Sequence, residues 1–289
     1  MGGTSDYGID DLPRFSPWPA RLLGLDPWEP KHKTPLEVTR EFEYEKWGPL
    51  LKEVREAQRD VTVEEVDSWM ARDAPTTLCS IGNRLECLSP AQAHQKYLNL
   101  VESVLMPFLP ATALVELGAG YGSMILALCK RMPFAQMPIF AGEYTASGIE
   151  LIRRLAKTQL IMIETGHCDF GSPQVVDFSI PQGAVIFTSF AMHYLPTLTS
   201  NCIKKLSASH PRAVVHFEPC YEHCDNQNLL GLMRKRYIEV NDYNTNLVSL
   251  LRSQQDQGLI QIIDERPAVF GRNPLFAASV MVWSLSLHK

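Results

Sequence analysis

Short apolar runs alternate with amphipathic segments from about residue 111 onward. Five of these runs lie at residues 113–117, 139–141, 160–163, 184–187 and 213–217. Two further runs of strand-like composition follow at residues 259–263 and 279–283. Continuous apolar strands separated by helices are typical of a parallel sheet that is covered on both faces. This part of the chain is therefore predicted to form an α/β fold.

The first third of the chain has a different pattern. Apolar positions at helical spacing predict one helix over residues 36–57 and a second that begins at Ser89-Pro90, where serine can cap the helix and proline suits its first position. Residues 1–35 are rich in proline and tryptophan, and because proline fixes φ and lacks a donor, we expect extended chain there. We thus predict an extended and helical N-terminal cap over residues 1–108 and a sheet domain over residues 109–289.

Composition excludes several classes of function. The net charge is −5 and no basic stripe is present, which argues against a nucleic-acid partner. No apolar stretch reaches the roughly 18 residues that a membrane span needs, so no membrane partner is expected. Seven cysteines, an odd number without the spacing of a disulfide framework, favour reduced thiols. The acidic, proline-rich start is unlike a secretory leader, so a cytoplasmic location is predicted.

The most informative segment is a glycine-rich turn after the first predicted strand. Gly118, Gly120 and Gly122 alternate with other residues, and a helix is predicted to follow. Such a turn lets the backbone approach a ligand closely. The spacing G-x-G-x-G differs from the dinucleotide fingerprint G-x-G-x-x-G. Glu116, two residues before the first glycine, would repel a pyrophosphate but could hold an ammonium group, which favours a cofactor that carries an amino acid.

Acidic residues also follow the next two predicted strands. Glu143 lies where a doubly wound fold grips ribose hydroxyls. Asp169 could accept a hydrogen bond from an adenine amino group while Phe170 packs on the ring. Each acid alone could be a solvated loop residue. Because the carboxyl ends of parallel strands share one edge of the sheet, the three acids together predict a ligand site there.

These residues and the strand order resemble the class I S-adenosylmethionine-dependent methyltransferases over about residues 108–289. The resemblance implies a Rossmann-like, doubly wound sheet of seven strands, mostly parallel, whose last strand at residues 279–283 inserts antiparallel. It assigns no subfamily. It implies S-adenosyl-L-methionine as the cofactor, with its methionine part facing Glu116 and the glycines, its ribose facing Glu143 and its adenine facing Asp169. The full predicted cofactor-binding set is Glu116, Gly118, Ala119, Gly120, Gly122, Glu143, Tyr144, Asp169, Phe170, Ser189 and Phe190.

Candidate catalytic residues follow the fourth and fifth predicted strands. By the resemblance, the end of the fourth strand faces the transferring carbon, and His193 and Tyr194 lie just beyond it. Histidine, with an ordinary pKa near 6.5, can remove a proton at neutral pH. An equally simple interpretation is that His193 begins a helix and bonds locally. Glu218, after the fifth strand, could orient or deprotonate a substrate.

Two histidines and two cysteines near Glu218 raise the question of a metal. Cys220 and Cys224 have no second cysteine pair elsewhere, unlike a closed zinc site. His216 lies inside a predicted strand and is expected to face a packed side of the sheet. We therefore predict no metal.

A long helical region is predicted over residues 226–255. Within it Tyr237, Asn241 and Asn244 recur at i, i+4 and i+7, so they would share one face. Amides and phenols on one face could bind the polar groups of a small substrate, although a wet helix surface would show the same pattern.

Aromatic residues of the N-terminal zone could form a lid. Trp18, Trp28, Tyr44 and Trp47 could place ring faces over a positively charged sulfonium. The alternative is ordinary packing between the cap and the sheet domain, the usual role of buried aromatic residues.

These residues leave three functions to be distinguished. The first is methyl transfer to an oxygen or nitrogen atom of a small metabolite, driven mainly by positioning of the reactants. The second uses the same cofactor to transfer or cyclise its aminocarboxypropyl group and releases methylthioadenosine, as azetidine-2-carboxylate and nicotianamine synthases do. The third is a non-catalytic scaffold, which has no use for all three acids. A small-molecule substrate is the predicted partner, and the sequence leaves the oligomeric state open.

Overall fold

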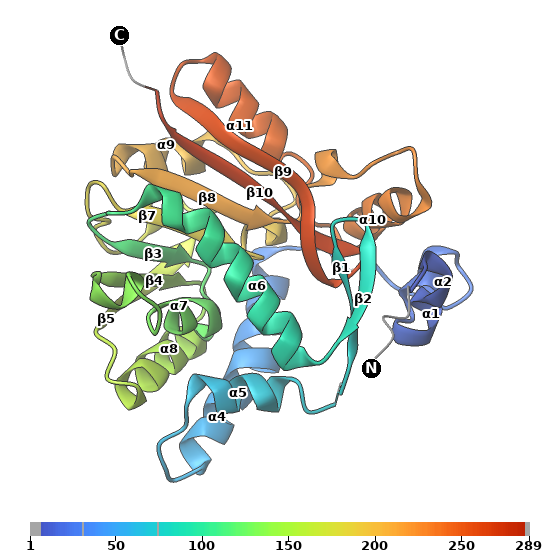
Figure 1. Ribbon diagram of the computed structural model, residues 1–289, viewed down its shortest axis with the longest axis horizontal. Helices are drawn as coiled ribbons and strands as arrows, with labels where there is room; N and C mark the ends of the chain where they lie inside the picture. The colour runs from blue at the N-terminus through green and yellow to red at the C-terminus, as the bar shows by residue number, and fades with distance from the viewer. Residues whose placement is uncertain (1–6, 31, 74, 287–289) are drawn as a thin grey trace.

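A long twisted sheet runs through the molecule and carries helices on both faces (Figure 1). In the computed structural model, which describes residues 7–30, 32–73 and 75–286, ten strands form this sheet in the order β2-β1-β9-β10-β8-β7-β3-β4-β5-β6. The strands are β1 (Thr77–Ile81), β2 (Arg84–Leu88), β3 (Leu114–Leu117), β4 (Ile139–Glu143), β5 (Ile163–Asp169), β6 (Val175–Val176), β7 (Val185–Ser189), β8 (Ala213–Glu218), β9 (Ile260–Asn273) and β10 (Phe276–Leu285).

The middle of the sheet has the predicted arrangement. Strands β5, β4, β3, β7 and β8 are parallel neighbours. The last strand, β10, inserts antiparallel between β8 and β9, with Ser279 opposite Glu218. The antiparallel last strand is thus confirmed, and this inner order is the one that the resemblance implies. The whole sheet is mixed and not mostly parallel, because five of its nine neighbouring strand pairs are antiparallel.

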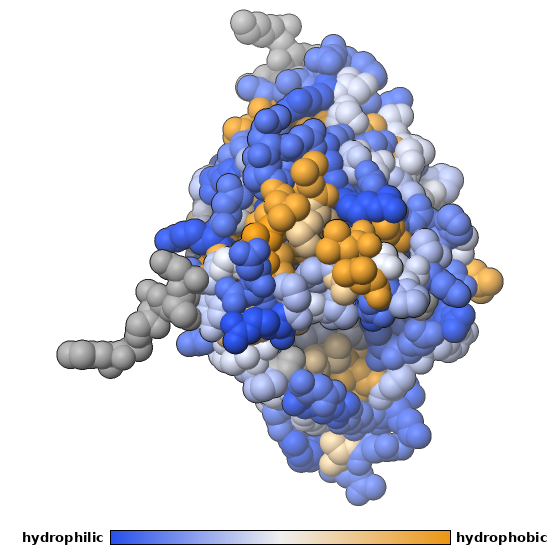
Figure 2. All heavy atoms as spheres, turned by 90° about the vertical axis from the view of Figure 1, so that its right-hand side faces the viewer, coloured by the Kyte–Doolittle hydropathy of each residue, from blue (hydrophilic) through white to orange (hydrophobic). Residues whose placement is uncertain are grey.

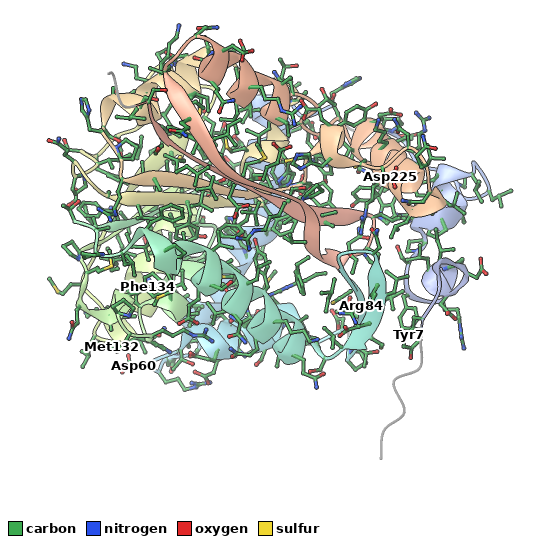
Figure 3. All side chains as sticks on the ribbon, turned by 45° about the horizontal axis from the view of Figure 1, so that its top comes forward. Tyr7, Asp60, Arg84, Met132, Phe134 and Asp225 are labelled. Atoms are coloured by element: carbon green, nitrogen blue, oxygen red, sulfur yellow. The ribbon has the colours of Figure 1, made fainter. Side chains whose placement is uncertain are left out.

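The predicted number of seven strands is wrong, because β1, β2 and β6 add to the sheet. Strands β1 and β2 form a hairpin whose two-residue turn begins with Gly82 at φ +61°, and β1 pairs antiparallel with β9. A glycine followed by Asn83 is a recognised signal for a tight hairpin, and it was missed. Figure 3 labels Arg84 at the start of β2 and Tyr7 beside it, consistent with the bridge between Tyr7 and Leu85.

Two strand positions also need correction. Residues 160–162 of the predicted run form a loop, in which Leu160 and Met162 are 92% and 90% exposed, and β5 begins only at Ile163. The run at residues 259–263 is the start of β9, which continues to Asn273. Apolar content alone does not locate this strand, since β5 has the mixed sequence IETGHCD.

Seventeen helical segments occur among the described residues. They are η1 (Ile9–Asp11), α1 (Leu12–Phe15), α2 (Trp18–Leu22), α3 (Pro35–Thr39), η2 (Arg40–Trp47), α4 (Gly48–Glu56), α5 (Val63–Met70), α6 (Pro90–Leu105), η3 (Met106–Phe108), α7 (Ser123–Leu128), η4 (Phe134–Gln136), α8 (Ala146–Thr158), η5 (Met192–Tyr194), α9 (Ser200–Ala208), η6 (Tyr221–His223), α10 (Leu229–Val240) and α11 (Leu247–Asp256). One core cluster packs α4, α6, α7 and α8 on one side of the sheet, and a second packs α9 and α11 on the other.

The N-terminal zone differs in part from the prediction. Short helices η1, α1 and α2 replace the extended chain, and Pro13 and Pro19 lie in their first turns, where a missing N–H costs nothing. Residues 1–6 and 31 of this zone lie outside the described residues. The predicted helix over residues 36–57 is confirmed as α3, η2 and α4 in direct succession, with η2 in the wider π-helical form.

The long helix predicted over residues 226–255 is instead two helices, α10 and α11. Asn241 ends α10, Asp242 has φ +54°, and the chain is irregular up to Asn246. Asparagine and aspartate side chains bond to nearby backbone groups, which competes with helix formation. Asn244 therefore does not share a helical face with Tyr237 and Asn241.

The surface carries apolar side chains on the face that bears α2 and α10 (Figure 2). Leu23 and Leu25, just after α2, and Leu229 and Leu232 of α10 are exposed. Throughout the described ranges, every helix is too short or too polar to cross a membrane.

Replacing Ser89 with alanine tests the start of α6. The Ser89 hydroxyl accepts a hydrogen bond from Gln92 N, and Gln92 Oε1 accepts one from Ser89 N. We expect Ser89→Ala to lower the free energy of unfolding by about 1 kcal/mol in urea denaturation. Ser103→Ala, in the last turn of the same helix, should cost less than about 0.5 kcal/mol. Equal losses for the two variants would contradict the cap.

Candidate functional site

A cavity of about 700 Å³ opens at the carboxyl ends of β3, β4, β5 and β7. It lies where open α/β sheets bind ligands. Eleven of the predicted site residues line it, namely Glu116, Gly118, Ala119, Gly120, Glu143, Tyr144, Asp169, Phe170, Ser189, Phe190 and Tyr194. The predicted residues that lie outside its lining are Gly122, His193, Glu218, Tyr237, Asn241 and Asn244.

The glycine turn requires glycine for geometric reasons. Gly118 has φ +77°, and a Cβ there would lie 2.2 Å from the Cβ of Ala191. Gly120 has φ +58°, and a Cβ there would approach Trp47 Cζ2 to 3.2 Å. The turn is thus pressed between the loop after β7 and the N-terminal cap.

The amides of this turn are already bonded within the protein. Gly118 N and Ala119 N both donate to the Gly142 carbonyl, at 2.8 and 2.9 Å. Gly120 N donates to Glu143 Oε2 at 2.9 Å. These N–H groups are therefore not free to cradle a phosphate, which agrees with the sequence argument against a dinucleotide.

The side chain of Glu116, a residue of β3, contacts the first turn of α7. It is 2% exposed, and its Oε2 accepts a hydrogen bond from Ile125 N at 3.0 Å. A dinucleotide-binding fold holds a pyrophosphate at this helix end, so the carboxylate occupies the place of that anion. Burial raises the pKa of Glu116 well above its ordinary value, against the opposing hydrogen bond from Ile125. A cation in the cavity would be attracted to this carboxylate and lower its pKa again.

Glu143 and Asp169 end β4 and β5. Glu143 is 5% exposed, and its Oε1 accepts hydrogen bonds from Thr145 N at 3.0 Å and Thr145 Oγ1 at 2.7 Å. Burial raises the pKa of Glu143, while these bonds oppose the rise. Asp169 Oδ1 accepts from Gly171 N at 2.8 Å. Both carboxylates are held in fixed orientations by nearby donors, and each oxygen has lone pairs left for a ligand.

The turn after β7 is held from below by Glu218. Both Glu218 oxygens accept a hydrogen bond from Ala191 N, at 3.0 and 3.1 Å. Phe190, the residue before Ala191, has φ +51°. Glu218 is 1% exposed. The carboxylate therefore fixes the turn that presents Ser189 and Phe190 to the cavity.

His193 lies behind this turn. Its Nδ1 is 3.5 Å from Glu218 Oε2, and the side chain is 4% exposed. Its ring packs edge-on against Tyr243 and Phe276, with centroids 4.9 and 4.8 Å away. Burial lowers the pKa of His193, and Glu218 opposes this. Direct proton removal from a substrate by His193 or Glu218 would require the turn to open.

The N-terminal cap contributes one wall. Trp47 and Phe42 line the cavity, but of the four predicted lid residues only Trp47 does so. Trp18 instead packs against Trp28 and Tyr237, with ring centroids 4.7 and 4.5 Å away. Tyr44 is 70% exposed.

Glu41 ties the cap to the cavity. It accepts from Lys46 Nζ at 2.7 Å, Lys33 Nζ at 2.9 Å and the Tyr194 hydroxyl at 3.1 Å. Burial raises the pKa of Glu41, but the two lysines outweigh it and hold the pKa at about 2. Glu43, two residues on, accepts from Ser147 N at 3.1 Å and so joins the cap to α8.

Sequence reasoning missed the opposite wall. Tyr97 of α6 lines the cavity, bonds to Ser189 Oγ at 2.7 Å and stacks on Phe270 with centroids 5.3 Å apart. Arg272 and Phe276, from β9 and β10, also line it. The period of α6 marks Tyr97 as a core residue, and no local motif marks the other three.

The predicted substrate face is not assembled as a wall of the cavity. The Asn241 amide donates to Tyr237 O at 2.8 Å, and the Asn244 amide donates to Leu195 O at 2.8 Å. Asn244 Oδ1 accepts from Asn246 N and Leu247 N. These amides stabilise the loop between α10 and α11.

The histidines and cysteines near β8 make internal bonds. His216 Nδ1 pairs with Thr188 Oγ1 at 3.0 Å, and its Nε2 accepts from Trp283 Nε1 at 2.9 Å. His223 Nε2 lies 2.7 Å from Glu265 Oε1. Over the part of the chain that the structure describes, no group of three or more His, Cys, Asp or Glu side chains could hold a metal ion.

The order β5-β4-β3-β7-β8-β10-β9, with β10 antiparallel and acidic residues of β3, β4 and β5 lining one cavity, agrees with the arrangement expected from the resemblance to the class I S-adenosylmethionine-dependent methyltransferases. No family profile and no curated protein sequence matches the chain.

Several solved structures are similar to this chain. Magnesium protoporphyrin IX methyltransferase from Synechocystis PCC 6803 with bound S-adenosylhomocysteine shares 14% identity, with 68% of this chain and 84% of that chain covered and a TM-score of 0.48. An S-adenosylmethionine-dependent methyltransferase from Clostridium acetobutylicum ATCC 824 shares 9% identity, with 67% and 92% covered and a TM-score of 0.47. An O-methyltransferase from neocarzinostatin biosynthesis shares 11% identity, with 66% and 57% covered and a TM-score of 0.42. Similarities this low carry no argument about activity.

The low pKa of Glu41 predicts a pH dependence. A carboxylate whose folded pKa falls from 4.5 to about 2 contributes stability that is present above pH 4.5 and is lost as the pH falls through 2. Glu41→Gln should therefore lower the free energy of unfolding by about 1–3 kcal/mol at pH 7. The difference from the wild type should shrink between pH 4.5 and 2, as measured by urea denaturation.

Glu45→Gln is the matched control on the same helix. Its carboxylate is 48% exposed and pairs with Arg40, so its removal should cost less than about 1 kcal/mol. A Glu41→Gln effect that stays constant down to pH 2 would contradict the proposed ion pairs.

Proposed function

We propose that the chain binds S-adenosyl-L-methionine in the cavity and transfers its methyl group to an oxygen or nitrogen atom of a small metabolite. One observation carries the proposal. Glu116, Glu143 and Asp169, from the ends of three neighbouring parallel strands, converge on one cavity beside a glycine turn whose amides are already bonded. Such a site favours a cationic amino-acid end and a nucleoside over a pyrophosphate.

The residues present fit this cofactor. Glu116 would hold the ammonium group, Glu143 the ribose hydroxyls and Asp169 the adenine amino group, with Phe170 packed on the adenine. When bound, the cofactor supplies an electrophilic methyl carbon on a positively charged sulfur. Phe42 and Trp47 line the cavity, where aromatic ring faces would attract the positive sulfur and help to exclude water.

The chain's own residues contribute mainly by positioning. The turn after β7 brings three side chains to the proposed acceptor side of the cavity, those of Ser189, Phe190 and Tyr194. Glu218 holds that turn in place. Holding acceptor and cofactor in line is the largest available contribution to the rate. In this arrangement Glu218 is a positioning residue, and His193 supports the turn from behind.

The aminocarboxypropyl reaction uses the same binding groups, so by-products distinguish it. We expect S-adenosylhomocysteine to form only when an acceptor is added, as measured by mass spectrometry of reactions with and without a panel of small hydroxy and amino compounds. Methylthioadenosine released from the cofactor alone, above the rate without protein, would replace methyl transfer with the aminocarboxypropyl reaction.

Binding provides a separate test. Glu143→Gln keeps the shape of the side chain but removes the negative charge of the carboxylate, which would accept hydrogen bonds from the ribose hydroxyls. We expect it to weaken S-adenosylhomocysteine binding by about 10- to 100-fold in isothermal titration calorimetry.

Glu150→Gln is the control for that titration. It changes a surface glutamate on the neighbouring helix α8, where Glu150 pairs with Arg55 and Arg154, and it should leave the affinity unchanged. A wild-type chain that binds no S-adenosylhomocysteine would overturn the proposed function.

A further inference from the structure

Arg272 is a cation on the cavity wall without an anionic partner. It lies at the end of β9 and lines the cavity. Among the described residues, no carboxylate pairs with it, and its Nη2 donates to His94 Nδ1 at 3.1 Å. The other lysine or arginine in the lining, Lys33, is bonded to Glu41 at 2.9 Å. The charge of Arg272 is thus available to a ligand.

The surrounding structure holds Arg272 in place. The Thr77 hydroxyl donates to Arg272 O at 3.1 Å, and Gly271 pairs with Ser80, so the hairpin of β1 and β2 anchors this end of β9. His94 orients the guanidinium as a neutral acceptor. Burial lowers the pKa of His94, Asp67 opposes this and the Arg272 charge reinforces it.

The walls beside Arg272 are aromatic. Tyr97, Phe190, Phe270 and Phe276 line the same cavity. Tyr97 stacks on Phe270, and Phe190 lies 5.9 Å from Phe276 between ring centroids. Arg272 itself is exposed, so a ligand could reach its guanidinium from the cavity while the ligand's ring packs on these aromatic side chains. A planar guanidinium also matches the two oxygens of a carboxylate.

The sheet order separates Arg272 from the three acids. Strands β3, β4 and β5 carry the acids, whereas β9 lies beyond β7, β8 and β10. The acidic side of the cavity repels a carboxylate, and the Arg272 side attracts one. The Trp47 ring lies beside Gly120, and its buried Nε1 has no hydrogen-bond partner within the described chain. The carboxylate of the cofactor's amino-acid end could therefore accept a hydrogen bond from Trp47 and would not need Arg272.

We propose that Arg272, oriented by His94, binds a carboxylate of the methyl acceptor, and that the acceptor is a small aromatic acid. This inference rests on the proposed cofactor site. The acceptor's ring would lie between Tyr97, Phe190 and Phe276, with its carboxylate on Arg272 and its nucleophilic atom toward the end of β7. Methyl transfer then forms a bond from that atom to the methyl carbon as the carbon–sulfur bond breaks, its electron pair stays on sulfur, and the acceptor's proton passes to water.

The test compares a carboxylate with its neutral isostere. With S-adenosylhomocysteine saturating, 4-hydroxybenzoate and 4-hydroxybenzamide are titrated into the wild type and into Arg272→Gln by calorimetry. We expect the wild type to prefer the carboxylate by about tenfold or more. Arg272→Gln should abolish that preference.

Arg266→Gln is the matched control. Arg266 lies on the same strand, pairs with Asp264 and is outside the cavity lining, so the variant should keep the wild-type preference. Equal affinity of the wild type for the two probes, or binding of neither, would overturn the proposal.

A second titration checks whose carboxylate is bound. S-adenosylhomocysteine carries a carboxylate and 5′-methylthioadenosine carries none. We expect Arg272→Gln to bind both within about twofold of the wild type. A selective loss of S-adenosylhomocysteine binding would assign Arg272 to the cofactor and refute its assignment to the acceptor. Failure of the wild type to bind S-adenosylhomocysteine at all would instead refute the proposed function.

Discussion

Carboxylates buried at the carboxyl ends of the parallel strands need hydrogen-bond donors, and this need accounts for much of the local structure around the cavity. A buried carboxylate is costly unless donors surround it. Glu116 is met by the first turn of α7, and Glu143 by the glycine turn and by Thr145, the residue before α8. The starts of two helices and the path of the glycine turn therefore follow from the same requirement. The donors also fix the carboxylates before any ligand arrives, which lowers the cost of ordering them on binding.

The N-terminal cap also carries carboxylates that are surrounded by hydrogen-bond donors. Its π-helical segment η2 places Glu41 among Lys33, Lys46 and Tyr194, and Glu43 against the start of α8. These charged contacts lie in the first half of that segment, while Trp47, its last residue, packs against Gly120 of the glycine turn. The cap thus forms one wall of the cavity and is joined to the rest of the site by a few charged contacts.

The cofactor side of the cavity could be predicted because its residues follow strand ends in short local patterns. Glu116, Glu143 and Asp169 are each readable from the strand that precedes them. The roles of His193 and Asn244 could not be judged from sequence, since their burial depends on what packs above them. The His193 side chain packs against Tyr243 and lies close to Glu218. The Asn244 side chain bonds to the backbone in the loop after α10.

The acceptor side escaped prediction for a topological reason. Tyr97, Phe270 and Arg272 are far apart from Ser189 in the chain and meet only because β9 runs on for 14 residues and α6 crosses the sheet. The hairpin of β1 and β2, read from sequence as part of a helical cap, pairs with that extension and fixes Arg272. The proposed cofactor motifs are local, whereas the proposed acceptor wall combines α6 with the end of β9 and the start of β10. In the proposed function, the choice of acceptor would therefore depend on the long β9 and on the added hairpin that anchors its end.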